Sequence, residues 1–83
     1  MKVELITPQG VLRQGEFTAA VAPGADGELG ILSHHAPMVA ALGKGVLRLA
    51  AGAQSEGWRL EGGFLLVEAN HLRVIAEKAD KAG

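Results

Sequence analysis

The chain has 83 residues, of which 48% are hydrophobic and 20% are charged, and its formal net charge at pH 7 is −1. This composition favours one small folded domain over disorder, and the balanced charge argues against nucleic acid or an anionic membrane as a partner. The absence of cysteine excludes a disulfide scaffold and thiolate chemistry. No apolar run approaches the length of about 18 residues that spans a bilayer, and the N-terminus lacks the apolar centre of a signal peptide, so we expect no direct membrane insertion.

Short alternating segments separated by turn residues fill the first half of the chain. Residues 3–6 and 11–13 are expected strands, and a third strand is expected over residues 17–22. The segment 23–27, Pro-Gly-Ala-Asp-Gly, predicts a compact turn, because proline presets φ and glycine accepts positive φ. Residues 28–32 alternate, which places Leu29 and Ile31 on one face of a strand and Glu28, Gly30 and Leu32 on the other.

The second half continues the same pattern. Residues 38–42 are apolar on both faces, which predicts a strand that is covered on both sides or crosses the core. Gly43–Gly45 predicts a tight hairpin turn, and Ala69-Asn70 predicts a two-residue hairpin connection. Further strands are expected over residues 46–50, 57–61 and 64–68, and Leu72 and Val74 are expected to point inward on either side of Arg73.

These patterns predict the fold class. Turn signals recur about every ten residues and no segment keeps a helical period, which is typical of an all-β protein. We predict a single domain over residues 1–83, a small flattened β-sandwich or barrel of about eight to ten short strands. Residues 77–83 are charged and rich in alanine, and we expect them to fray.

The usual catalytic and metal-binding patterns are missing. Gly43-Lys44 lacks the upstream glycine and the following Ser or Thr of a phosphate-binding loop. His34 and His35 are adjacent and would point to opposite faces of an extended chain, and neither serine lies in a nucleophile elbow. We therefore predict no catalytic, cofactor-binding or metal-binding residue. The lack of these patterns favours a binding domain, or a component of a larger assembly, over an enzyme.

The stretch Asp26 to Pro37, DGELGILSHHAP, combines turn residues with polar side chains that have no evident structural role. It closely resembles the signature of the epsilon subunit of rotary F-type ATP synthases, called delta in mitochondria. Gly45–Leu49 is similar to the G-V-L-R-I strand of that family, and Gly62–Glu68 is similar to its G-G-F-x-x-V strand. The resemblance covers roughly residues 3–79 without large gaps.

The resemblance implies a function. It implies a β-sandwich in the central stalk, or rotor, which binds the gamma subunit and the ring of membrane-embedded c subunits and couples ion flow to ATP synthesis without an active site or cofactor of its own. It also implies a place peripheral to the membrane, through the ATP synthase complex, at the cytoplasmic face of a bacterial plasma membrane or an equivalent energy-coupling membrane. The expected interface with the ring and stalk consists of Glu28, Leu29, Gly30, Ile31, His35, Ala36 and Pro37.

Two departures from the family are visible. Family members in bacteria and chloroplasts normally continue into a pair of C-terminal helices, which can inhibit hydrolysis and in some members bind ATP; no residues of this chain match them, so the resemblance does not carry that regulation here. Ser33 and His34 stand where the family usually has Pro followed by Gly or Asn. The alternative to a rotor subunit is a free-standing β-sandwich that binds a small ligand or a peptide, which would have no need for the ordered set from Glu28 to Pro37.

Overall fold

Eight β-strands make up the fold, and the computed structural model describes residues 1–82. The all-β prediction is confirmed, and no helix in the described part of the chain is long and apolar enough to cross a membrane. The strands are β1 (Lys2–Thr7), β2 (Gly10–Glu16), β3 (Ala19–Gly24), β4 (Gly27–Leu32), β5 (Met38–Ala41), β6 (Lys44–Ala51), β7 (Gln54–Glu68) and β8 (His71–Ala82).

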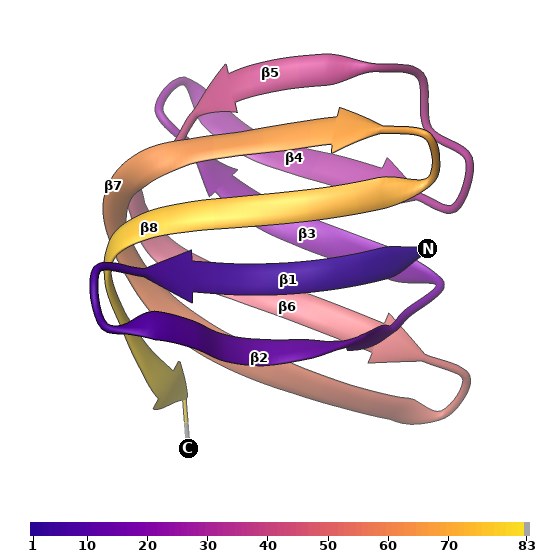
Figure 1. Cartoon of the computed structure of the whole chain (residues 1–83), viewed down its shortest axis with the longest axis horizontal. Coiled ribbons are helices and arrows are strands. Elements are labelled where there is room, and N and C mark those ends of the chain that lie inside the picture. Colours follow the sequence, from indigo (N-terminus) through magenta and orange to yellow (C-terminus); the bar gives the residue numbers. More distant parts are fainter. Residues whose placement is uncertain (83) are drawn as a thin grey trace.

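One hydrogen-bonded path connects the strands in the order β2-β1-β8-β7-β6-β3-β4, with β5 also paired to β7. In Figure 1, β5, β1 and β2 form the front layer together with the second half of β7 and the first half of β8, and β4, β3 and β6 lie behind it with the remaining halves of β7 and β8. Neighbouring strands are antiparallel except β1 and β8, which are parallel. The principal extents are 26 × 25 × 23 Å, so the sandwich is less flattened than expected.

β7 and β8 bend sharply and contribute to both layers. β5 and β6 pair with β7 in the same register, one on each side of this bend, so together they act as one interrupted strand. At the break, the Leu42 N–H donates to the Gly63 carbonyl (2.9 Å) and the Gly62 N–H donates to the Gly43 carbonyl (3.2 Å). The hairpin predicted at Gly43–Gly45 is therefore wrong, because the chain turns a corner there without reversing direction.

Inward-facing apolar side chains from both layers form the core. They alternate with exposed residues along the strands, as the period of two requires. Each fully buried Leu, Ile or Val contributes about 1.5–3 kcal/mol relative to an exposed one. The fully buried members with the largest volume are Leu5, Ile31, Leu47, Leu49, Leu60, Leu65, Leu72, Val3, Val67 and Val74.

β5 is covered on one face only. Met38 and Ala40 are half-buried and pack against the core, whereas Val39 is 69% exposed. The prediction that residues 38–42 are covered on both sides or cross the core is therefore wrong. The sequence is apolar on both faces, but only one layer of the sandwich lies against this short edge strand.

The C-terminal segment is a paired strand. In place of the fraying expected over residues 77–83, the outer half of β8 continues the ladder with β7, and Lys78 pairs with Glu61 while Ala82 pairs with Gly57. Half-buried Ala79 packs against the core, which gives this charged segment an anchored face. Residue 83 lies outside the described residues.

The predicted connection between β7 and β8 is confirmed. Ala69 and Asn70 have φ values of 49° and 58°, as a two-residue turn between twisted antiparallel strands requires. Positive φ is uncommon for alanine, so the hairpin on both sides must hold Ala69 in this conformation.

Candidate functional site

β4 carries the central part of the predicted interface. Ile31 is fully buried and Leu29 is half-buried against the core, while Glu28, Gly30 and Leu32 are exposed. This confirms the predicted faces of the strand. It also gives the interface residues two different roles, because buried Ile31 can only anchor the segment and Glu28 and Gly30 are free to meet a partner.

The turn before β4 depends on two glycines. Gly27 has a φ of 133°, which only glycine adopts readily. A Cβ on Gly24 would lie 2.5 Å from the Gly27 carbonyl oxygen, so a side chain there would break the turn. Asp26 lies in the turn and Glu28 follows on β4, and both side chains are exposed.

The loop after β4 is held from three sides. The Ser33 N–H donates to the Thr18 carbonyl (3.2 Å), the His34 N–H donates to Oδ1 of Asn70 (2.8 Å), and the His35 N–H donates to the Leu32 carbonyl (3.1 Å). His34 has a φ of 65°, the left-handed conformation that Gly and Asn favour. This conformation explains why the family described above usually has Gly or Asn at the position of His34.

The ring of His35 is oriented by its own backbone. Nδ1 lies 2.6 Å from the Ala36 carbonyl, which can only accept, so Nδ1 carries the proton of this bond. In the neutral ring, Nε2 is then an acceptor available to a partner. Ala36 and Pro37 follow as exposed residues.

Glu28 and His35 lie at opposite ends of β4. At 3.3 Å per residue, the strand separates Glu28 from Leu32 by about 13 Å, and His35 lies beyond Leu32. The structure therefore does not bring the two polar side chains together. A partner that touches both must run along the strand.

A groove of about 330 Å³ lies between the start of β4 and strand β5. Asp26 and Glu28 are its charged residues, and its other wall is formed by Val39–Ala41. The Ala25 N–H donates to the Ala41 carbonyl (2.9 Å) and joins the two walls. No positively charged side chain lines the groove among residues 1–82, so its electrostatic character is acidic.

A second group of polar residues, which the sequence did not indicate, joins β2, β7 and β8. Arg13 forms a bidentate ion pair with Glu56 through Nε and Nη2 at 2.8–3.1 Å, and Trp58 Nε1 donates to the same carboxylate at 2.8 Å. Lys81 Nζ lies 3.3 Å from Oε2 of Glu56. The hydrogen bonds from Arg13, then those from Trp58 and Lys81, lower the pKa of Glu56 to about 2 against the partial burial that opposes them.

This group is a structural clamp. Arg13 and Glu56 lie 43 residues apart on different strands, and the ion pair holds the edge strand β2 against the start of β7. The Arg13 guanidinium also lies over the Phe17 ring and the Lys81 ammonium over the Trp58 ring, each 5.1 Å from the ring centre. Trp58 is half-buried, packs against the core with its ring and belongs to this clamp.

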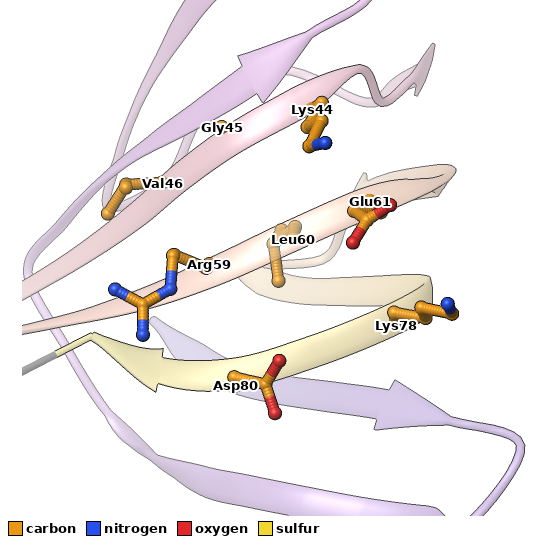
Figure 2. A pocket seen from close by; sticks show the side chains of 8 residues that line it. All are labelled: Lys44, Gly45, Val46, Arg59, Leu60, Glu61, Lys78 and Asp80. Atoms are coloured by element: carbon orange, nitrogen blue, oxygen red, sulfur yellow. The ribbon is translucent and has the colours of Figure 1, made fainter.

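A third charged area lies on the outer face of β6, β7 and β8 (Figure 2). Lys44, Glu61 and Lys78 form one cross-strand row, and Arg59 and Asp80 lie in the next row. Charges of both signs alternate around a shallow hollow of about 250 Å³. Alternating charges on adjacent strands stabilise an exposed sheet modestly. Because the two signs are mixed, the hollow has no net preference for a positively or a negatively charged ligand.

The described residues thus form a small all-β sandwich domain. Its candidate binding surface is the exposed, acidic edge of β4 with its flanking loops. Comparison with known proteins makes the assignment specific. Residues 1–82 match the family described as ATP synthase, Delta/Epsilon chain, beta-sandwich domain.

Relatives agree with this match. The ATP synthase epsilon chain of Desulforamulus reducens is 42% identical over 81 residues, which are 98% of this chain and 61% of the relative. That of Chlorobium limicola is 40% identical over 77 residues, which are 92% of this chain and 88% of the relative. The chain belongs to the ATP synthase delta/epsilon family and corresponds to its β-sandwich domain. It spans about three fifths of the length of the first curated relatives it matches.

Solved structures share the fold. A chain in the structure of the Euglena gracilis mitochondrial ATP synthase (OSCP/F1/c-ring) superimposes with a TM-score of 0.88 at 22% identity and covers 95% of this chain and 51% of that one. A chain in the central stalk/c-ring structure of the Tetrahymena thermophila mitochondrial ATP synthase gives 0.83 at 21% identity, with 96% and 65% covered.

Proposed function

We propose that this domain is a non-catalytic part of the central stalk of an F-type ATP synthase, where it links the gamma subunit to the membrane ring of c subunits and helps to couple ion flow to ATP synthesis. The observation that carries the proposal is the family membership together with the exposed Glu28 on an anchored edge strand. The domain is peripheral to the membrane and reaches it through the complex, at the cytoplasmic face of a bacterial plasma membrane or of an equivalent energy-coupling membrane.

We place the ring contact along β4, from Glu28 to the loop Ser33–Pro37. An exposed segment held by a rigid scaffold suits a binding surface, and buried Ile31 with half-buried Leu29 supplies the scaffold. The Glu28 carboxylate can accept a charge-assisted hydrogen bond from a polar loop of the ring, and Nε2 of His35 can accept a second bond farther along the strand. Such a bond contributes about 1.5–3 kcal/mol if it is shielded from water and less than about 1 kcal/mol at an exposed rim.

The test uses single substitutions in the assembled complex. Glu28→Lys should weaken co-purification of the domain with the c ring by about fivefold, which corresponds to about 1 kcal/mol, and should leave the fold and gamma binding unchanged. His35→Ala should have a smaller effect in the same direction. Both are compared with Asp80→Lys, the same kind of charge reversal at an exposed position of β8, which is separated from β4 by β7, β6 and β3.

Ring association is measured at low and high salt, and proton pumping is measured in the same preparations. Salt should weaken the wild-type contact and have less effect on Glu28→Lys, because screening acts on the interaction that the substitution has already removed. If both variants fold, bind gamma and retain the ring like Asp80→Lys, the β4 surface is not the ring contact. If the wild-type domain does not co-purify with gamma at all, the alternative of a free-standing binding domain replaces the proposal.

A further inference from the structure

β4 is an edge strand whose outer hydrogen-bonding groups can be assigned. The carbonyl of Pro23 accepts a hydrogen bond from the Gly43 N–H at 2.8 Å, so it points away from β4. Pro23 is paired with Glu28, and in an antiparallel ladder a pair that turns its backbone groups away from each other alternates with a hydrogen-bonded pair. Glu28, and Gly30 two residues later, therefore direct their N–H and C=O groups to the free edge.

The facing wall of the groove shows the same alternation. The Ala41 carbonyl accepts from Ala25, so it points away from its partner strand β7. Val39, two residues earlier, also turns its backbone groups away from β7, and its side chain is 69% exposed. The groove between β4 and β5 is thus bordered by unpaired backbone groups, which are the usual template for an additional strand.

Gly30 adds an open face to this edge. A Cβ at Gly30 would meet no atom of the chain within 4 Å, and its φ is not among the positive ones. Neither backbone conformation nor internal packing therefore requires glycine here. The bare surface leaves room for a side chain of an incoming strand, a recognised use of glycine within strands.

The charge of the groove limits the occupant. Asp26 and Glu28 are its two charged residues, and both are exposed carboxylates. A segment that binds along this edge must satisfy backbone donors and acceptors and bring a positive charge toward these carboxylates.

We propose that β4 receives an extended segment of the ring partner, which carries Lys or Arg opposite Asp26 or Glu28 and adds a strand to the sheet through the N–H and C=O groups of Glu28 and Gly30. Strand addition of this kind takes its affinity from main-chain hydrogen bonds and its specificity from alternate side chains. The identity of the partner as the ring rests on the proposed function. The mode of binding, strand addition, rests on the free backbone groups of β4.

Gly30→Pro tests the mode of binding. It removes an N–H that makes no bond within the sheet, and proline is tolerated at such an edge position, so the domain should fold. Gly30→Ala is the matched control, since it keeps the N–H and its Cβ stands perpendicular to the sheet in open space. With the purified gamma–ring subcomplex as the probe, Gly30→Pro should weaken association tenfold or more. Gly30→Ala should have a smaller effect, because its methyl group narrows the open face but leaves the main-chain N–H in place.

The outcomes separate this inference from the proposed function. If Glu28→Lys weakens ring association and a folded Gly30→Pro does not, strand addition is wrong and the ring contact stands. If neither substitution has an effect, both fail at this surface. If the free domain dimerises and Gly30→Pro abolishes the dimer without changing ring association, the edge serves a second copy of the chain and the inference is overturned.

Amide hydrogen exchange on the wild-type domain tests the same point without relying on a folded variant. The amides of Glu28 and Gly30 should exchange rapidly in the free domain and become protected in the gamma–ring complex. Those of Leu29 and Ile31, which face β3, should be protected in both states. Unchanged exchange at Glu28 and Gly30 on assembly would overturn the proposal.

Discussion

One carboxylate joins three strands that are distant in sequence. Glu56 on β7 accepts from Arg13 on β2 and from Trp58 on its own strand, and it pairs with Lys81 on β8. Its side chain is only 15% exposed, so these bonds are stronger than those of an ordinary surface ion pair. β2 is an edge strand whose only neighbour in the sheet is β1. The clamp adds a second attachment, because it ties β2 to β7 through the side chains.

Glu56→Gln should lower the free energy of unfolding at pH 7 by about 1–3 kcal/mol, because it replaces a charge-assisted pair with neutral hydrogen bonds. The pKa of Glu56 is lowered from 4.5 to about 2 by folding, so its carboxylate stabilises the fold above pH 4.5 and loses this effect as pH falls toward 2. The difference in stability between wild type and variant should therefore be constant near neutral pH and shrink below pH 4.5. Urea unfolding across this range measures it, and a difference that stays the same down to pH 2.5 would contradict the assignment.

At the scale of elements, the corner of β7 fixes how the two layers meet. Gly63 has a φ of 110°, and a Cβ there would lie 2.0 Å from the Ile75 carbonyl oxygen on β8. Close approach of two backbones makes the sharp bend possible, and only glycine permits it.

Gly63→Ala should therefore destabilise the domain by about 3 kcal/mol or more, since it combines a strained conformation with a steric clash against backbone. Gly30→Ala, where the added Cβ meets nothing, is the control and should change stability by less than about 0.5 kcal/mol. Urea midpoints of the two variants give the comparison. Equal midpoints would mean that the corner relaxes and that close approach does not define it.

Sequence patterns predicted most strands and the exposed and buried faces of β4, because alternation along a strand is a local property. They did not predict that β5 and β6 share a register on β7, since the tight-turn composition at Gly43 is equally compatible with a corner. The pairing of the C-terminal segment and the clamp at Glu56 also depend on which strands meet in space. Arg13 and Glu56 are both ordinary charged residues in the sequence, and only the closure of the sandwich brings them together.

At the scale of the whole molecule, the two ends of the chain are assembled side by side. β1 pairs in parallel with β8, so the first and last strands of the described chain are neighbours in the same layer. β8 lies between β1 and β7 and contributes buried Leu72 and Val74 to the core. The sheet cannot close until nearly all of the chain is present.

Folding should consequently be slow for a domain of this size, with refolding on a timescale of milliseconds to seconds, as for other folds dominated by pairings between distant segments. The single tryptophan, Trp58, lies in the clamp and reports closure of the sandwich by its fluorescence. Stopped-flow refolding gives the rate. A microsecond phase that accounts for the whole fluorescence change, or a chain ending at Asn70 that still folds, would contradict this order of assembly.

The bent hairpin of β7 and β8 also has a mechanical consequence. Eleven residue pairs connect these two strands across both layers, so a sideways force on one layer is transmitted to the other through backbone hydrogen bonds loaded together in shear. Individually each bond contributes only about 0.5–1.5 kcal/mol, but bonds loaded in parallel must yield together. If the domain occupies the stalk position proposed above, we expect it to act as a stiff coupling, with elastic deformation concentrated in the contacts with its neighbours and little twist within the domain itself.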